Sequence, residues 1–364
     1  MVPKSAAWWR IRELRSAPPV QGLGDEREAT FRSALEQSEQ LFDAASQVPL
    51  STSPLLAFYG LTQAGRAITA AWNDDSCWVP PSSHGIRSSR GSDFESLTVT
   101  EQRPGEFQSV SAALASASFG KAALRDLIGL LPGLDAGFQL SDDALRPLEV
   151  ASLHPSGGLL ITGVGPIRSW LCGLPEHLLV ADDKRQAITD FLAGYPTLAG
   201  WRFLPNHDPT LMQPLDRGWA TQLEWLTEGE WLNTGLERAA MKPPPGRDEL
   251  WVPPAVGDGV LAPMMVWWAV LMSLSTMVRY EPAGWAQMTD VDVSRYAVSL
   301  ERLMHHALDD VPRHILQALV EPQGWKPDWP ERLGAADGTV SENHEADKPE
   351  DAENEQRDEL RRGR

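Results

Sequence analysis

Side chains that could do chemistry stand at two places in the sequence, at His84 and in the polar segment 279–281. His84 follows a Pro-Pro-Ser-Ser run and precedes Gly85, so a loop is predicted there. A loop histidine can act as a general base, but most are solvated or bonded to backbone, and spacing identifies no carboxylate partner. Arg279, Tyr280 and Glu281 end the most hydrophobic stretch of the chain.

Two interpretations of Arg279 remain open. Its guanidinium can bond the exposed carbonyls at a helix end and favour the negative end of the helix dipole. Alternatively, it projects into a cleft and binds a carboxylate or a phosphate through two parallel hydrogen bonds. In that case the candidate cleft residues are His84, Arg279, Tyr280, Glu281 and Arg313.

Other combinations of reactive residues lack the spacing that known sites require. His305 and His306 are adjacent, so on a helix they point about 100° apart, and neither HExxH nor paired cysteines accompany them. No metal site is therefore expected. Arg302 stands too close to these histidines for the Arg-to-His spacing of helical HEPN-type ribonucleases. Because no Gly-rich phosphate loop and no GxSxG occur, no cofactor is expected and no catalytic motif is recognised.

Helices are predicted in the N-terminal part of the chain. Asp25 is a candidate N-cap with a glutamate three residues later, which is the spacing of a capping box. A second helix is predicted to open at Ser53 and Pro54, with the serine as cap and the proline in the first turn. Gly60 and Gly65 within its apolar run would permit close contact with a neighbouring element, at a cost of about 1 kcal/mol each relative to alanine.

The C-terminal part is also predicted to be helical. Residues 259–278 carry no charge, and if Pro263 lies in the first helical turn, a helix of about 24 Å remains. Since a bilayer core is about 30 Å thick, a buried core helix is predicted rather than a membrane span. A further amphipathic helix is predicted over residues 293–308, and Val311-Pro312 is predicted to start another.

The middle of the chain is rich in glycine, proline and short apolar runs. Strands are predicted at 159–164 and 219–225, with a helix at 181–192 between them. The Lys242-Pro-Pro-Pro-Gly246 segment is a stiff connector and a candidate boundary. The predicted fold is therefore mostly α, with a mixed α/β middle region.

Four segments are predicted from these patterns. They are an N-terminal helical segment (1–76), a mixed α/β middle region (77–245), a C-terminal helical segment that packs on the first (246–333) and a disordered acidic tail (334–364).

Charge and cysteine content limit the partners and the compartment. The formal charge is −18, and −13 remains on the body because the tail holds ten acidic and five basic residues. This balance does not favour nucleic acid or an anionic membrane as partner. Only Cys77 and Cys172 occur, too few for a disulfide framework, and Arg10 and Arg12 interrupt any apolar export signal. We expect a cytoplasmic protein that does not enter a membrane.

Three blocks carry a resemblance to a known family: Ser53–Leu61 (SPLLAFYGL), His84-Gly85-Ile86, and Leu274–Pro282 (LSTMVRYEP), which is followed by Trp285. Their order resembles the YaaC-like family of bacterial proteins, which begin with an SPLL-type helix, continue with a His-Gly dipeptide and end with an Arg-Tyr-x-Pro-x-x-Trp segment. The resemblance extends over roughly 8–319. Because the family has no assigned activity, the resemblance implies membership of that family but no mechanism.

Three functions follow from the sequence as hypotheses. The favoured one is an interaction or binding protein, with another protein as the expected partner, because no complete catalytic motif is present. The second is an enzyme directed at nucleic acid or a nucleotide, such as a helical ribonuclease-like protein, which requires a positive cleft around His84, Arg279 and Arg313. The third is a small-molecule binding module, because the chain has 15 tryptophans, whose side chains could line the walls of an apolar pocket.

Overall fold

The fold is mostly α with a mixed α/β middle region, as expected. The computed structural model describes residues 6–74, 78–91, 93–102, 104–134, 137–138, 140, 144–151, 167–199, 201–203, 219–225 and 240–327. The predicted strand at 159–164 and the predicted tail at 334–364 lie outside these residues. How the predicted segments divide into domains stays a prediction.

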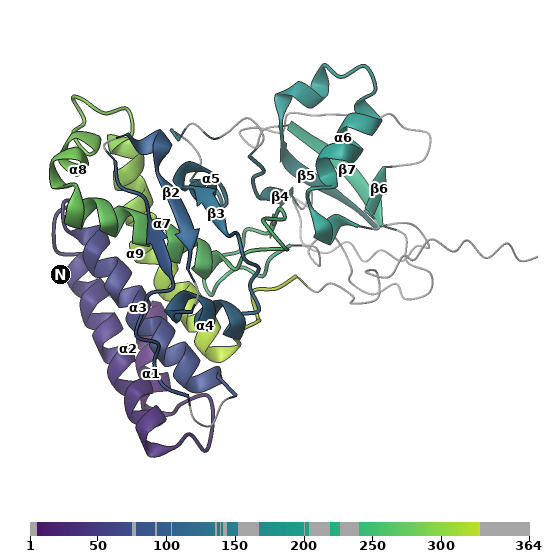
Figure 1. Cartoon of the computed structure of the whole chain (residues 1–364). Helices are drawn as coiled ribbons and strands as arrows, with labels where there is room; N and C mark the ends of the chain where they lie inside the picture. The colour runs from purple at the N-terminus through teal and green to yellow at the C-terminus, as the bar shows by residue number, and fades with distance from the viewer. Residues whose placement is uncertain are drawn as a thin grey trace, which may run out of the picture. The chain divides into compact units, whose positions relative to one another are not determined.

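The helices and strands follow one another in the order shown by colour in Figure 1. The α-helices are α1 (Ala6–Ser16), α2 (Asp25–Ala45), α3 (Ser53–Trp72), α4 (Glu106–Ala113), α5 (Leu124–Gly129), α6 (Lys184–Leu192), α7 (Pro263–Tyr280), α8 (Pro282–Met288) and α9 (Ala297–Val320). The strands are β1 (Ile86–Ser88), β2 (Thr98–Glu101), β3 (Lys121–Ala123), β4 (Leu148–Ala151), β5 (Ile167–Leu174), β6 (Trp201–Phe203), β7 (Trp219–Trp225) and β8 (Trp251–Val252). Short 3-10 turns are η1 (Phe94–Ser96), η2 (Glu176–Leu179) and η3 (Pro196–Leu198).

The N-terminal helices begin at the expected residues but are capped differently. Asp25 is the first helical residue of α2 and Gly24 is its N-cap, so the predicted capping box is wrong. Acidic side chains in the first turn of α2 favour the helix dipole instead. In α3 the hydroxyl of Ser53 donates to the carbonyl of Ala45 (2.9 Å) and does not cap the helix. Pro54 stands in the first turn of α3, as predicted.

Helix α7 is a core helix, buried on nearly all sides, and Pro263 opens it as predicted. It packs against α3 at Gly65, where a methyl group on the α-carbon would come within 2.4 Å of the Trp268 ring, so only glycine permits this approach. Gly60 allows an equally close contact with Phe42 of α2. Within the part of the chain that the structure describes, no helix is both long and apolar enough to cross a membrane.

The prediction of two consecutive helices near the C-terminus is wrong, because a single helix, α9, covers both. It runs without a break through Pro312, which lies inside the helix. A proline there removes one backbone hydrogen bond and costs about 3 kcal/mol. Val311, Pro312 and Ile315 are all buried, so burial of the apolar face offsets that cost.

Tryptophan indoles link segments that are distant in sequence. Each donates its Nε1–H to a backbone carbonyl on another element: Trp72 to Leu319 (3.2 Å), Trp285 to Leu50 (3.2 Å) and Trp325 to Leu114 (3.0 Å). The first two bonds join the N-terminal helices to the C-terminal ones, which share one hydrophobic core.

Two antiparallel sheets make up the β structure of the described residues (Figure 1). The first has the order β1-β2-β3, and its β1 is joined to α7 by a hydrogen bond between the hydroxyls of Ser88 and Ser273 (2.8 Å). The second has the order β6-β7-β5-β4-β8, and α6 packs on it through the buried Ile188. The predicted strand at 219–225 is confirmed as β7, and the predicted helix at 181–192 as α6, which begins three residues later.

Candidate functional site

The loop that carries His84 is fixed on the first turn of α4. Gly85 has φ +71° and passes so close to Gly105 that neither residue has room for a side chain. The carbonyl of His84 accepts the N–H of Phe107 (3.0 Å), and the carbonyl of Ser83 accepts the N–H of Glu106 (2.9 Å). The glycine of the His-Gly dipeptide therefore has a structural role, because it holds His84 in place.

The imidazole of His84 lies against the aromatic side chains of α3. Its ring centre is 5.2 Å from that of Phe58 and 6.2 Å from that of Tyr59. Burial lowers the pKa of His84, and the positive charges of Arg279 and Arg66 lower it further. The neutral imidazole is favoured here, and a neutral imidazole can accept a proton or a hydrogen bond.

Arg279 reaches the same tyrosine from the end of α7. Its Nη1 donates to the hydroxyl of Tyr59 (3.2 Å), and its Nε donates to the carbonyl of Ser275 (3.3 Å) within its own helix. The first interpretation is observed, since Nε bonds a carbonyl of its own helix. The second, a paired hydrogen bond to a carboxylate or a phosphate, stays a prediction. The expected proximity of His84 and Arg279 is observed, with Tyr59 in contact with both.

The other candidate residues are divided between two places. Tyr280 is 49% exposed, and the guanidinium carbons of Arg279 and Arg90 lie 5.0 and 4.0 Å from its ring centre. Glu281 joins α7 to α8 through its backbone, donating to Met277 and accepting from Trp285. Arg313 lies elsewhere on α9, where it donates to the carbonyl of Pro245 (2.8 Å) and pairs with Asp309 (3.2 Å). The predicted convergence of Arg313 with His84 and Arg279 is therefore wrong.

A buried carboxylate that the sequence does not reveal accompanies His84 and Arg279. Glu106 is 1% exposed, and both of its carboxylate oxygens lack a hydrogen-bond partner among the described residues. Its nearest cation is Arg66, whose Nε is 3.8 Å away. Burial raises the pKa of Glu106 to about 7, although the charge of Arg66 opposes that rise. A glutamate at the start of a short helix is ordinary in sequence, so only the fold identifies this one.

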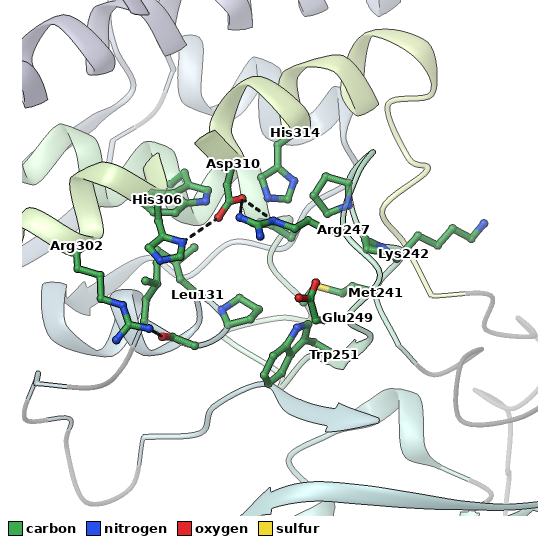
Figure 2. Close-up of a pocket in the computed structure, with 17 residues that line it drawn as sticks. Leu131, Met241, Lys242, Arg247, Glu249, Trp251, Arg302, His306, Asp310 and His314 are labelled. Atoms are coloured by element: carbon green, nitrogen blue, oxygen red, sulfur yellow. Dashed lines mark hydrogen bonds and ion pairs between the residues drawn. The ribbon is translucent and has the colours of Figure 1, made fainter. Parts of the chain in front are cut away.

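A cavity of about 240 Å³ lies beside α9 and is here called the α9 cavity (Figure 2). Its apolar wall comes from α7, from the turn after α5 and from the proline-rich connector. That wall consists of Leu131, Pro132, Leu134, Met241, Pro243, Pro244, Trp251, Pro263 and Trp267. Its polar side chains are Arg247, Glu249, Arg302, His306, Asp310 and His314, and Lys242 also stands at its edge.

Asp310 organises the polar side of the α9 cavity. It accepts two hydrogen bonds from Arg247, at 2.6 Å from Nη2 and 3.1 Å from Nε, and lies 3.6 Å from Nδ1 of His306 (Figure 2). The hydrogen bond to Asp310 raises the pKa of Arg247. Packing around His314 lowers its pKa to about 4, so its imidazole is neutral near pH 7. The polar side of the cavity thus places the hydrogen-bond donors of Arg247 close to the carboxylate of Asp310 and the imidazole of His306.

The two walls of the cavity come from different parts of the chain. Figure 2 shows His306, Asp310 and His314 extending from α9 toward Glu249 and Trp251, while Lys242 points away. Arg302, His306, Asp310 and His314 recur at every fourth residue, which places them on one face of α9. That polar stripe on an otherwise amphipathic helix is the signal by which the site could have been found in the sequence. Arg247 gives no such signal, being 63 residues from its partner Asp310.

Among the described residues, no three potential metal-ligating side chains of His, Cys, Asp or Glu are grouped closely enough to hold a metal ion. In the α9 cavity, Asp310 is instead bonded to Arg247 and lies beside His306. The arrangement suits hydrogen bonding to an organic molecule better than coordination of a cation.

Comparison with known proteins gives one match. The family model described as YaaC-like Protein matches residues 12–319, which include the last five residues of α1, α2 to α8, α9 up to Leu319, the His84 loop and every described residue around the α9 cavity. No curated protein and no solved structure matches the chain. Since the match extends over most of the sequence, this chain belongs to the YaaC-like family.

Proposed function

We propose that this protein is a binding protein that holds a compact organic molecule in the α9 cavity. The observation that carries the proposal is the cavity itself, in which an apolar wall with Trp251 and Trp267 faces the Asp310–Arg247 pair. Ligand sites typically combine apolar walls with a few convergent polar groups. The volume of about 240 Å³ lies just below the usual range for such sites, which favours a compact ligand.

The charges of the cavity indicate the kind of ligand. Arg247 and Arg302 are balanced by Glu249 and Asp310, and Lys242 points away (Figure 2). A balanced wall favours a neutral or zwitterionic molecule over a strongly charged one, because an unmatched charge would lose its hydration without gaining a partner. A ligand with a flat ring could stack against Trp251 and direct a polar group toward Asp310, and so contact both the apolar and the polar wall.

This proposal retains the favoured hypothesis of a binding protein and specifies a small molecule. A protein partner stays a prediction from composition, since the large exposed apolar side chains in the described residues are spread over several elements. The cytoplasm stays the proposed compartment, supported by a cysteine content too low for a disulfide framework.

The first test is native mass spectrometry of the purified full-length chain, before and after gentle denaturation. We expect a small molecule to be retained and then released. A library of neutral and zwitterionic ring compounds, followed by ligand-observed NMR, then gives binders that Trp251→Ala and Asp310→Asn weaken about tenfold or more. Trp9→Ala, at a tryptophan that is 56% exposed on α1, is the matched control and should bind normally.

Two results would overturn the proposal. One is the absence both of a retained molecule and of any binder from the library. The other is a set of binders that Trp251→Ala and Asp310→Asn leave unchanged, since that would place the ligand elsewhere. A stable protein partner without a small molecule would return the interaction hypothesis to first place.

A further inference from the structure

Three arginines and a histidine gather at the surface where α3, the β1 region and the end of α7 meet. They are Arg66, Arg90, Arg279 and His84, and we call them the arginine cluster. Two tyrosines connect three of them: Tyr59 contacts His84 and Arg279, and Tyr280 contacts Arg279 and Arg90. Arg66 belongs to the group because its charge acts on His84. The cluster shares no residue with the α9 cavity.

Little negative charge compensates the cluster. Among the residues that the structure describes, neither Arg90 nor Arg279 forms an ion pair, and both instead lie over tyrosine rings. Arg66 has only Glu106 nearby, at 3.8 Å, and its Nε makes no hydrogen bond. Other arginines of the chain do have carboxylate partners: Arg10, Arg12, Arg15, Arg32, Arg247, Arg295 and Arg313.

Carboxylates outnumber cations in this chain, which has a formal charge of −18, yet none of the described ones pairs with Arg90 or Arg279. The positive charges of Arg279 and Arg66 add to burial in lowering the pKa of His84, so both charges act at this imidazole. Positive groups without a carboxylate partner are common where a binding site is prepared for a ligand of the opposite charge.

The geometry suits an anion with several oxygens. Guanidinium groups bind phosphate through parallel N–H donors, and two of them here lie within about 5 Å of the same tyrosine ring. Tyr59 presents a hydroxyl, and His84 presents an imidazole that makes no hydrogen bond to the described residues. The side chain of Arg66 is 37% exposed and Tyr280 is 49% exposed, so the cluster is open to solvent.

We propose that the arginine cluster binds the phosphoryl group of a small phosphorylated molecule. A carboxylate offers two oxygens and one negative charge, whereas a dianionic phosphoryl group offers three oxygens and two charges and can accept from two guanidiniums and from Tyr59 at once. The site is separate from the α9 cavity, so one can exist without the other. No chemical step is assigned to it.

The test is a calorimetric titration of the full-length chain, at low ionic strength, with inorganic phosphate, pyrophosphate and a nucleoside monophosphate. The wild type should bind at least one of them saturably. Arg279→Gln and Arg90→Gln should each weaken that binding about tenfold or more, because each removes charged donors. Arg32→Gln, at an arginine paired with Glu28 on α2, is the matched control and should bind as the wild type does.

The pattern of binding also identifies the source of the phosphoryl group. Tighter binding of the nucleoside monophosphate than of inorganic phosphate would indicate a nucleotide, and equal binding would indicate that the phosphoryl group alone is recognised. Arg90 is exposed on a loop, so Arg90→Gln keeps the test valid even if Arg279→Gln disturbs the end of α7. Absence of saturable binding, or equal weakening by Arg32→Gln, would overturn the proposal.

Discussion

Replacing the buried Glu106 by glutamine should change how the stability of the protein depends on pH. The carboxyl group is 1% exposed and its pKa rises from the ordinary 4.5 to about 7 on folding. Between these two values the folded chain binds more protons than the unfolded chain, so unfolding becomes easier as the pH rises. The stability present below pH 4.5 is lost as the pH passes 7, and the pKa difference corresponds to about 3 kcal/mol.

Glutamine has nearly the same shape as glutamic acid but does not ionise. We therefore expect the free energy of unfolding of Glu106→Gln, relative to wild type, to rise by about 2–3 kcal/mol between pH 5 and pH 8. Urea unfolding at several pH values in this range, followed by circular dichroism, measures the difference. Glu13→Gln is the matched control, because Glu13 is exposed on α1 and should show little pH-dependent change.

The stability of Glu106→Gln must be compared with that of wild type at each pH, because another buried group changes the pH dependence of stability in the opposite direction. The pKa of His314 falls to about 4, so acidification below 6.5 destabilises the fold through this residue. In the wild type the two effects partly cancel. A difference between Glu106→Gln and wild type that stays constant from pH 5 to pH 8 would refute the assignment of a desolvated carboxylate at Glu106. A difference that shrinks with rising pH would refute it as well.

Two further predictions concern the core and the α9 cavity. Gly65→Ala should lower the free energy of unfolding by about 2 kcal/mol, because the added methyl group would meet the Trp268 ring at 2.4 Å. Gly91→Ala is the control, because its methyl group would meet only Ser96 Oγ at 3.7 Å, and it should change the free energy of unfolding by less than about 1 kcal/mol in urea unfolding. Equal losses in the two variants would contradict the packing argument. His314→Gln should become more stable relative to wild type as the pH falls from 6.5 to 4, because the wild-type imidazole does not take up a proton until the chain unfolds. Thermal unfolding at several pH values measures the difference in melting temperature. A difference that stays constant over this range would contradict the lowered pKa of His314.

The helices were largely predictable from the sequence because apolar periodicity and proline placement are local signals. Pro263 marks the start of α7, and the glycines of α3 mark close helix contacts. The helix break predicted at Pro312 was wrong because burial of the surrounding apolar face outweighs one lost hydrogen bond, and burial is set by the whole fold. The caps predicted at Asp25 and Ser53 failed for a related reason, since Ser53 finds a carbonyl partner on α2 instead.

The candidate site was predictable only in part. His84 and Arg279 could be selected because both stand in blocks that resemble one family, and Tyr59, which connects them, lies in a third block. Arg279 and Tyr59 are 220 residues apart, so their contact depends on how α3 packs on α7. The unpaired state of Glu106 and the pairing of Arg247 with Asp310 are properties of the folded chain, and no spacing in the sequence encodes them.

The tryptophan bonds between distant segments have a consequence for synthesis on the ribosome. Trp72 and its partner Leu319 are 247 residues apart, and α3 is covered by α7 and α9, which are made last. At about 5–20 residues per second, roughly 10–50 s separate the appearance of the two partners. During that interval the faces of α3 that α7 and α9 cover in the folded chain have no partner, so the nascent chain presents apolar surface of the kind that aggregates or that chaperones bind.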